Sequence, residues 1–346
     1  MWLVRLWILV ATVCWSVLGH ASCQSNKAEN LGRGFHLGEV FGHTKSDFES
    51  IAKSGGKLVR FGINLKACPG CSRYEWPKAG IEELFQILES AQKYDLKVVL
   101  VLRPPPEQNS ELWSNPMLQK SVGDIWRWLA EQLKGRREVA AFDLVNEPHP
   151  SGTSFTEKEH KWEEFASRLI STIREKDPER TVVFEPSPGA RPMAFNYVRK
   201  LDFENVIYSA HFYEPFEFTH QRIGDPRFIQ VVDYPGKVSG LGTWNSDRLK
   251  HELDPIQAFQ KAANVKIYIG EFGAIRWSPV GSRDRYFSDL ISLFNMYDWS
   301  WTYHAYREWH GWDSEMGPVE AIRQRSSNAS AYQILIKGFS GCSNAD

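Results

Sequence analysis

Two glutamates directly follow short apolar runs of the sequence, an unusual position for a charged side chain. Glu147 lies in the sequence LVNEP, and Glu271 lies in YIGEFG. Burying a carboxylate without a partner is costly, so these positions suggest a chemical purpose. Two carboxyl groups that flank a sugar ring can hydrolyse its glycosidic bond, with retention at a separation of about 5–5.5 Å and with inversion at a larger one. The sequence contains no distance and leaves both outcomes open.

The apolar runs that carry these glutamates belong to a regular alternation of predicted strands and helices. Helical spacing of apolar residues occurs in five stretches, Ile81–Tyr94, Met117–Leu133, Lys158–Arg174, Asp247–Ala263 and Arg283–Tyr297. Short β-rich runs occur at eight places, Gly34–Gly38, Lys57–Phe61, Lys97–Leu102, Ala140–Val145, Thr181–Glu185, Val206–Tyr213, Lys266–Phe272 and Trp299–Tyr303. The alternation predicts βαβ units and a parallel sheet.

Eight strands joined by crossover helices favour a closed barrel over an open sheet. Closure removes the edge strands, and no GxGxxG motif of a dinucleotide-binding sheet follows the first run. A length of 346 residues fits one α/β barrel, and no repeat or low-complexity linker indicates a second module. We therefore predict an α/β fold of the (β/α)8 TIM-barrel class, with residues 23–346 as a single catalytic domain.

Polar side chains at the carboxyl ends of the strands meet at one face of such a barrel. Glu147 and Glu271 end the fourth and seventh predicted strands, which lie across the barrel mouth from each other. Arg60 closes the second strand, where its positive charge would hold Glu271 ionised. His211 and Tyr213 alternate along the sixth strand and therefore share one face.

Two further aromatic side chains complete the predicted substrate site. Trp301, in the sequence WSWTY of the last strand, is placed to form the floor of a sugar subsite, and His36 of the first strand is a candidate for substrate binding. Each residue alone has an ordinary structural explanation, such as a strand-end glutamate paired with a buried arginine or a tryptophan packed in the core. Their coincidence at strand ends favours a catalytic site.

These residues resemble the motifs of glycoside hydrolase family 5, the cellulase family. The sequences NEP at 146–148, HFY at 211–213 and EFG at 271–273, together with the tryptophan at 301, follow in the order of that family. NEP alone is not specific, whereas the combination is. The resemblance covers nearly all of the chain after residue 22, and the stretches 214–221 and 302–309 also resemble those of bacterial cellulases.

The resemblance implies a role for each of these residues. Glu147 would act first as general acid and then as general base, and Glu271 would form a covalent glycosyl-enzyme. Asn146 would hydrogen-bond the sugar 2-hydroxyl. Tyr213 and Arg60 would orient the nucleophile. His211 would support the acid/base, and Trp301 would form a platform beneath the sugar. No metal ion or other cofactor enters this mechanism, and the histidines lack HExxH-type spacing.

One residue departs from the family pattern. Many members end the third strand with a substrate-binding histidine, whereas this sequence has Arg103 in VVLVLRPPP. Arg103 would either donate to sugar hydroxyls or pair with a carboxylate such as Glu39. The departure leaves both glutamates in place and puts the sugar specificity in doubt.

The substrate that the resemblance favours is a β-1,4-glucan of the cellulose type, cut within its chain. A β-mannanase or a β-1,3-glucan hydrolase is the nearest alternative, because hydroxyl contacts can redirect specificity without changing the catalytic pair. A non-catalytic carbohydrate-binding barrel is a second class of function, which the presence of both glutamates disfavours. Further tryptophans are available for additional subsites, namely Trp76, Trp113, Trp244, Trp277, Trp309 and Trp312.

Charge and the N-terminal sequence limit the partners and the compartment. The net charge of −1 lacks the positive field that phosphate binding needs, so we expect no nucleic-acid partner. Arg5, an apolar run at 6–18 and small residues at 19–22 predict a cleaved signal peptide over residues 1–22 and a secreted or periplasmic protein. The apolar run is too short to span a bilayer comfortably. We expect no transmembrane segment in the mature chain, and a monomer.

Cysteines allow several arrangements. The chain has 5 cysteines, of which Cys14 lies in the predicted signal peptide. Cys68 and Cys71 could close a tight disulfide loop, and Cys23 with Cys342 could join the termini. Alternatively, Cys23 could carry a lipid anchor after cleavage, although His20 stands where such signals usually have an aliphatic residue.

Overall fold

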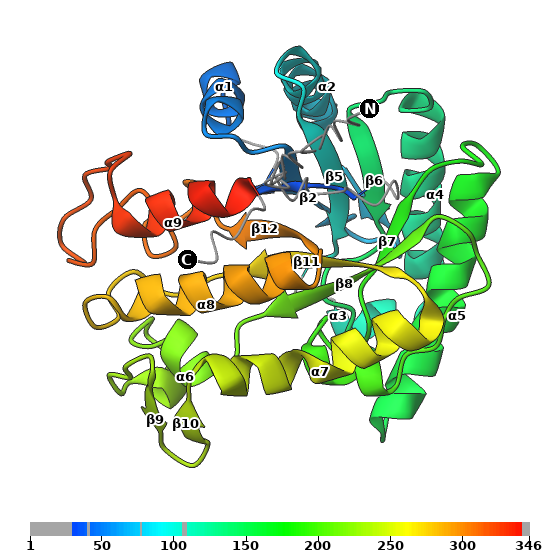
Figure 1. The fold of residues 1–346 in the computed structure, drawn as a ribbon. Helices are drawn as coiled ribbons and strands as arrows, with labels where there is room; N and C mark the ends of the chain where they lie inside the picture. The colour runs from blue at the N-terminus through cyan, green and yellow to red at the C-terminus, as the bar shows by residue number, and fades with distance from the viewer. Residues whose placement is uncertain (1–29, 40–41, 77, 106–108, 341–346) are drawn as a thin grey trace, which may run out of the picture.

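The computed structural model describes residues 30–39, 42–76, 78–105 and 109–340. Parallel strands form a closed barrel at its centre, in the order β1-β12-β11-β8-β7-β6-β5-β2 (Figure 1). Their bounds are β1 (Arg33–Glu39), β2 (Leu58–Asn64), β5 (Lys97–Arg103), β6 (Val139–Asp143), β7 (Val182–Phe184), β8 (Val206–Phe212), β11 (Lys266–Phe272) and β12 (Ser300–His304). Each predicted strand overlaps one of these, which confirms the predicted barrel class.

Helices surround the barrel, and five of them confirm the helical periodicity of the sequence (Figure 1). These are α2 (Lys78–Lys93), α4 (Pro116–Gln132), α5 (Phe155–Arg174), α7 (Ser246–Ala263) and α8 (Ser282–Met296). Local chemistry sets their starts. The Asn115 side chain accepts hydrogen bonds from the first turn of α4, which has proline at its first position, and the Ser154 hydroxyl caps α5.

Other elements were not predicted from the periodicity. Helices α1 (Lys45–Lys53) and α9 (Ser330–Phe339) complete the outer ring, while the connection after β7 holds only the 3-10 segment Pro192–Asn196. Short elements decorate the loops, namely α3 (Asn109–Leu112), α6 (Phe216–Thr219), the 3-10 segment Pro226–Phe228, and two hairpins, β3 (Lys66–Ala67) with β4 (Tyr74–Glu75) and β9 (Gly236–Val238) with β10 (Gly242–Trp244).

Apolar side chains fill both sides of the barrel wall. Inside the barrel, neighbouring strands contribute one cluster of buried residues, Leu58, Val99, Ala141, Val183, Ile207 and Tyr268 among them. The alternate side chains pack outward against the helices in the main core. Polar side chains at the carboxyl ends of the strands therefore lie above an apolar floor.

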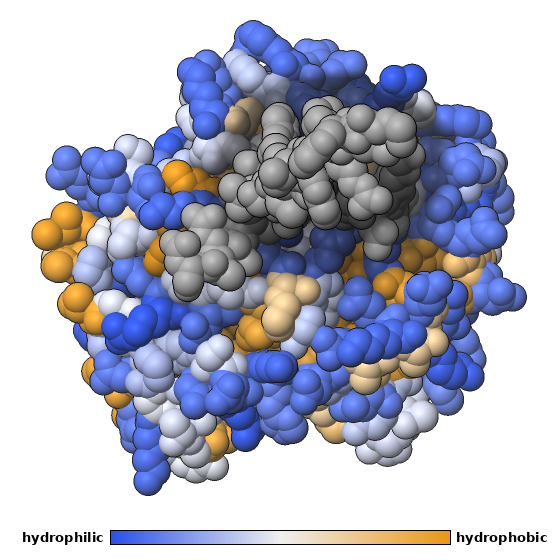
Figure 2. Space-filling model, viewed as in Figure 1, coloured by the Kyte–Doolittle hydropathy of each residue, from blue (hydrophilic) through white to orange (hydrophobic). Residues whose placement is uncertain are grey.

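Outside the barrel, the described surface is largely polar on one face (Figure 2) and a disulfide closes one loop. The described part of the face in Figure 2 is largely hydrophilic over α7 and α8. Within the ranges that the structure describes, every helix is too short or too polar to cross a membrane. A disulfide joins Cys68 to Cys71, one of the predicted pairings. The predicted signal peptide, Cys23 and Cys342 lie outside the described residues.

Candidate active site

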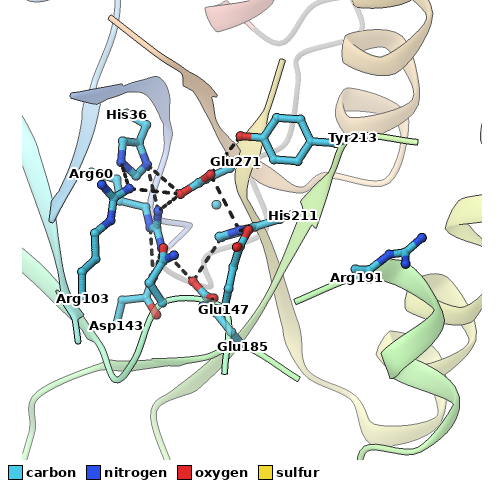
Figure 3. A network of polar contacts seen from close by, with 12 residues as sticks. His36, Arg60, Arg103, Asp143, Glu147, Glu185, Arg191, His211, Tyr213 and Glu271 are labelled. Carbon is cyan, nitrogen blue, oxygen red and sulfur yellow. Dashed lines mark hydrogen bonds and ion pairs between the residues drawn. The ribbon is translucent and has the colours of Figure 1, made fainter. Parts of the chain in front are cut away.

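Glu147 and Glu271 lie together at the carboxyl end of the barrel (Figure 3). Glu147 follows β6, and Glu271 is the penultimate residue of β11. One carboxylate oxygen of each glutamate and one ring nitrogen of His211 all lie within 4.8 Å of one another. The structure thus brings together the two carboxyl groups that the sequence places on separate strands.

Polar groups surround the carboxylate of Glu271, which is only 5% exposed. Arg60 Nη1 donates to Oε1 at 2.7 Å, and the Tyr213 hydroxyl donates to Oε2 at 2.9 Å. Arg103 Nη2 lies 3.4 Å from Oε1, and His36 Nδ1 lies 3.5 Å from the same oxygen. These contacts fix the orientation of both carboxylate oxygens.

Positive charge keeps Glu271 ionised. Burial alone would raise the pKa of Glu271, but the charges on His211 and Arg60 outweigh burial and hold this pKa well below its ordinary value. Burial also opposes the charge on Arg60, but Asp143, Glu185 and Glu271 raise the pKa of Arg60 well above its ordinary value. The buried guanidinium is therefore a permanent cation beside the nucleophile candidate.

Glu147 is held by its backbone and by its side chain. Its φ of 45° lies in the left-handed region, which is uncommon for residues other than glycine. Its backbone N–H donates to Glu185 Oε2 at 2.6 Å, and its Oε1 lies 2.8 Å from His211 Nδ1. The side chain of Glu147 is 43% exposed, so a ligand at this end of the barrel can reach it.

His211 connects these carboxylates. Its Nε2 forms an ion pair with Glu185 Oε1 at 3.1 Å, on the other side of the ring from Glu147. Burial opposes the charge on the ring, but Glu185, Glu271 and Glu147 raise the pKa of His211 to about 10. Both ring nitrogens therefore carry protons at neutral pH.

Comparison with known proteins identifies the family. A model described as cellulase, glycosyl hydrolase family 5, matches residues 23–311. The chain belongs to glycosyl hydrolase family 5. It is therefore a glycoside hydrolase, which confirms the family resemblance of its sequence motifs.

Relatives of this family 5 enzyme agree with the assignment. It is similar to Endoglucanase C of Acetivibrio thermocellus, with 28% identity over 285 residues that cover 74% of this chain and 81% of the relative. Two structures of Cel5A from Thermotoga maritima share its fold at 23% identity, covering 88% of this chain and 97% of theirs. Their TM-scores are 0.72 for a structure in complex with cellobiose and 0.70 for one in complex with mannotriose.

Three of the predicted site residues lie around the carboxylate of Glu271 in this family 5 enzyme. Arg60 is fully buried and donates to Glu271, as its expected orienting role requires, so it does not touch a sugar. His36 is also fully buried beside Glu271, which corrects the prediction that it binds substrate. Arg103 Nη2 lies 2.7 Å from His36 Nε2. The carboxylate that Arg103 meets is Glu271, while the side chain of Glu39 lies outside the described part of the chain.

Trp301 does not lie in the site. Its indole is fully buried, with ring centroids 5.5 Å from Phe272 and 5.2 Å from Phe339 of α9. Side chains alternate along β12, so Trp301 faces the helices, whereas Thr302 bonds to Tyr268 inside the barrel. The prediction of Trp301 as a sugar platform is wrong, because the register of the strand turns it outward.

We expect Trp301→Ala to destabilise the enzyme without altering catalysis. Removing a fully buried indole should lower the free energy of unfolding by about 3–5 kcal/mol. Urea unfolding measures this loss, and kcat/KM of the folded variant at low temperature should match that of the wild type. A large fall in kcat/KM with unchanged stability would show that the indole contacts substrate after all.

Another aromatic residue, Trp312, borders the site. Its ring centroid lies 6.1 Å from that of Tyr213 and 6.0 Å from that of His304, and the side chain is partly exposed. His304 ends β12, and its Nε2 pairs with Glu308 at 3.1 Å. In the sequence, Trp312 is one of several candidate tryptophans and His304 is not among the predicted site residues, although a polar residue at a strand end is the available signal.

Two buried carboxylates of the site, Asp143 and Glu185, were not predicted from the sequence. Asp143 ends β6 and Glu185 directly follows β7, and both are fully buried beside Arg60, at 2.9 Å and 2.7 Å. Burial and the neighbouring Glu185 raise the pKa of Asp143 well above its ordinary value. Arg60 Nη2 also donates to Asn146 Oδ1 at 3.0 Å, which orients the Asn146 amide beside Glu147.

Among the described residues, Glu147, His211 and Glu271 form a group whose atoms lie close enough to hold a metal ion. However, a histidine ligand needs an unprotonated ring nitrogen. Both nitrogens of His211 face carboxylates, and its raised pKa keeps both protonated. The group therefore fits proton transfer better than metal binding.

Proposed function

We propose that this enzyme is a retaining endo-β-1,4-glucanase. The observation that carries the proposal is the approach of the Glu147 and Glu271 carboxylate oxygens to within 4.8 Å. Retaining glycosidases hold their carboxyl groups about 5–5.5 Å apart, whereas inverting enzymes need about 6.5–9.5 Å to admit a water molecule. The surroundings of the two glutamates fit the two roles. Glu271, the proposed nucleophile, is buried among hydrogen-bond donors, whereas Glu147, the proposed acid/base, is accessible.

In the first step, Glu271 attacks the anomeric carbon while Glu147 gives its proton to the leaving oxygen. The bond from Glu271 to the sugar forms as the glycosidic bond breaks. Charged His211, 2.8 Å from Glu147 Oε1, stabilises the carboxylate that proton donation leaves behind. Arg60 and Tyr213 hold Glu271 in the attacking orientation.

In the second step, Glu147 takes a proton from water, and the oxygen of that water attacks the anomeric carbon. Glu271 departs as a carboxylate, and its returning negative charge meets Arg60, Tyr213 and Arg103. These donors are in place before the charge returns, so they stabilise the transition state without reorganising. Two inversions at one carbon give net retention.

The proposed substrate is supported by the similarity to Endoglucanase C. Reducing-sugar release from carboxymethylcellulose, glucomannan and laminarin separates the candidates, and we expect the highest rate on carboxymethylcellulose. Inactivity on carboxymethylcellulose with strong activity on another of these polysaccharides would overturn the glucanase proposal.

A β-mannanase is the second candidate, with a β-1,3-glucan hydrolase as a further alternative. A structural neighbour, Cel5A of Thermotoga maritima, was solved with mannotriose as well as with cellobiose. The same carboxyl pair would serve all three substrates, because specificity depends on hydroxyl contacts around it.

We propose Trp312 as the aromatic platform in place of Trp301, since its partly exposed ring adjoins Tyr213 at the nucleophile. Trp312→Ala should lower kcat/KM on cello-oligosaccharides about 30-fold, because stacking a sugar on an indole contributes about 2 kcal/mol. Trp312→Phe is the matched control and should retain most of the activity. An unchanged kcat/KM in the alanine variant would remove Trp312 from the substrate site.

The acid limb of kcat/KM should lie below about pH 4, the ordinary range of a glutamate. Positive charges lower the pKa of Glu271, so this nucleophile stays ionised as the pH falls through that range. Rates measured across acidic pH test this, with each sample re-assayed at neutral pH to exclude unfolding. An acid limb above about pH 5 would contradict the ionised nucleophile.

We also propose that the enzyme acts outside the cytoplasm. The predicted signal peptide motivates the proposal, and the disulfide between Cys68 and Cys71 supports an oxidising compartment. Intact mass before and after reduction tests it, and a hydrophobic mass adduct at Cys23 would indicate a lipid anchor instead of a freely secreted protein.

A further inference from the structure

A buried carboxylate beneath the site contacts Glu147 directly and reaches Glu271 only through Arg60 and His211, and it has no role in the mechanism above (Figure 3). Glu185 Oε2 accepts a hydrogen bond from the backbone N–H of Glu147 at 2.6 Å. Its Oε1 accepts one from Arg60 Nη2 at 2.7 Å and lies 3.1 Å from His211 Nε2. We propose that Glu185 is a positioning residue that holds the acid/base in its reactive place, an inference that rests on the proposed retaining function.

The backbone contact acts on the acid/base directly. Glu147 has a φ of 45°, and a conformation of this kind persists only where the surrounding structure holds it. Glu185 bonds to the N–H of that same residue, and the bond is strengthened by the carboxylate charge. The loop after β7 adds a second tie, because the Gly189 N–H donates to the carbonyl of Pro148.

The side-chain contact passes through His211. Glu185 pairs with one ring nitrogen, and Glu147 Oε1 lies 2.8 Å from the other. Other charged groups near the ring are Glu271, at 3.8 Å from Nδ1, Asp143, and Arg60, which bonds to the same Glu185 oxygen. Glu185 therefore holds Nε2, on the edge of the ring opposite to Glu147. This orients the ring so that its Nδ1–H points at the acid/base.

The nucleophile depends less on Glu185. Arg60 keeps its hydrogen bonds to Asp143 Oδ2 at 2.9 Å and to Asn146 Oδ1 at 3.0 Å, whatever stands at position 185. These two hydrogen bonds keep the Arg60 guanidinium oriented toward Glu271 without Glu185. A change at Glu185 should impair proton donation more than nucleophilic attack.

Glu185→Gln tests this inference with almost no change in shape. The three groups around the side chain, on Glu147, Arg60 and His211, are all N–H donors. A glutamine has one acceptor oxygen and one NH2 donor, so at least one donor must face another donor. The variant keeps the volume and loses the acceptor capacity on which the positioning depends.

The readout compares leaving groups that do and do not need a proton. On phenyl β-cellobioside, Glu185→Gln should lower kcat/KM about 100-fold, because a misplaced acid/base cannot protonate phenolate effectively. On 2,4-dinitrophenyl β-cellobioside, which departs without protonation, the loss should stay below about five-fold. Equal losses on both substrates, or no loss on either, would overturn the proposal.

Glu159→Gln is the matched control. Glu159 lies on α5, is fully buried, and accepts a hydrogen bond from the Ser187 N–H at 2.6 Å, two residues from Glu185. Burial raises the pKa of Glu159 to about 9, so it is neutral already and an amide replaces it closely. The kcat/KM of the Glu159→Gln variant should change by the same factor on both cellobiosides, because Glu159 contacts neither Glu147 nor Glu271.

A second variant protects the test against misfolding. Glu185→Asp keeps the negative charge beside Arg60 and His211 but withdraws the carboxylate from the N–H of Glu147 by one methylene. Glu185→Asp should lower kcat/KM on phenyl β-cellobioside about 10-fold, one tenth of the loss expected for Glu185→Gln. Its loss on 2,4-dinitrophenyl β-cellobioside should again be smaller. A wild type inactive on both cellobiosides would refute the glucanase itself, whereas an active wild type with uniformly slowed variants would refute only the role of Glu185.

Discussion

Glu271→Ala is expected to lower kcat on carboxymethylcellulose by about five orders of magnitude. The substitution removes the atom that bonds to the anomeric carbon, so the covalent route is lost. Folding should survive, because Arg60 keeps its ion pairs with Asp143 and Glu185. Initial rates and thermal unfolding of the purified variant measure both effects.

The same variant separates catalysis from a structural role. If Glu271 were only an ion-pair partner in a carbohydrate-binding barrel, the wild type would show no turnover and the variant would mainly lose stability. Glu175→Ala is the control, since this exposed carboxylate pairs with Arg127 on the outer surface, away from the site. Its kcat should equal that of the wild type, and residual activity of Glu271→Ala above about one per cent would contradict the nucleophile assignment.

Glu147→Ala is expected to lower kcat/KM on unactivated cello-oligosaccharides by about 10³-fold, the usual contribution of a general acid and base. The nucleophile remains, so 2,4-dinitrophenyl β-cellobioside should still form the glycosyl-enzyme. Water then attacks slowly because no base activates it. Steady-state and pre-steady-state rates on the two substrates measure this difference.

Azide gives the sharper outcome for this variant. It needs no base and fits the space that the Glu147 carboxylate vacates, so it should restore turnover of the dinitrophenyl substrate and yield the β-glycosyl azide. The wild type should show no acceleration, because its own carboxylate repels the anion. An α-glycosyl azide, or an absence of rescue with both substrates equally slowed, would contradict the acid/base assignment.

The barrel and the catalytic pair could be predicted because their signals are local. Apolar runs alternate with helical spacing, and a charged residue at the end of such a run stands out. The structure brings together the polar side chains that stand at the ends of these runs, namely Arg60, Glu147, His211, Tyr213 and Glu271. No distance was needed to group them, because the carboxyl ends of parallel strands meet at one face.

Trp301 shows where the same argument fails. The strand sequence WSWTY places its three aromatic side chains on one face and two small hydroxyl side chains on the other. This alternation does not tell which of the two faces meets the barrel interior. Register decides this, and β12 pairs Trp301 with Arg33 and with Ile269 in the closed sheet. Partner strands set the register, and they lie far away in the sequence.

The buried partners of Arg60 do not belong to the motifs that carry the family resemblance. Asp143 and Glu185 stand at strand ends like the catalytic glutamates, so the signal was present. What the sequence lacked was their convergence on one guanidinium. The pairing of Arg103 with Glu271 likewise follows from the tertiary structure and is not encoded in any local sequence pattern.

The most direct test of the double displacement is the configuration of the first product. Hydrolysis of cellotetraose, followed by ¹H NMR from the first minutes, shows the anomer released before mutarotation. Carboxyl groups that share one anomeric carbon predict the β-anomer first, followed by slow appearance of the α-anomer. Initial release of the α-anomer would mean a single displacement by water and would contradict this account.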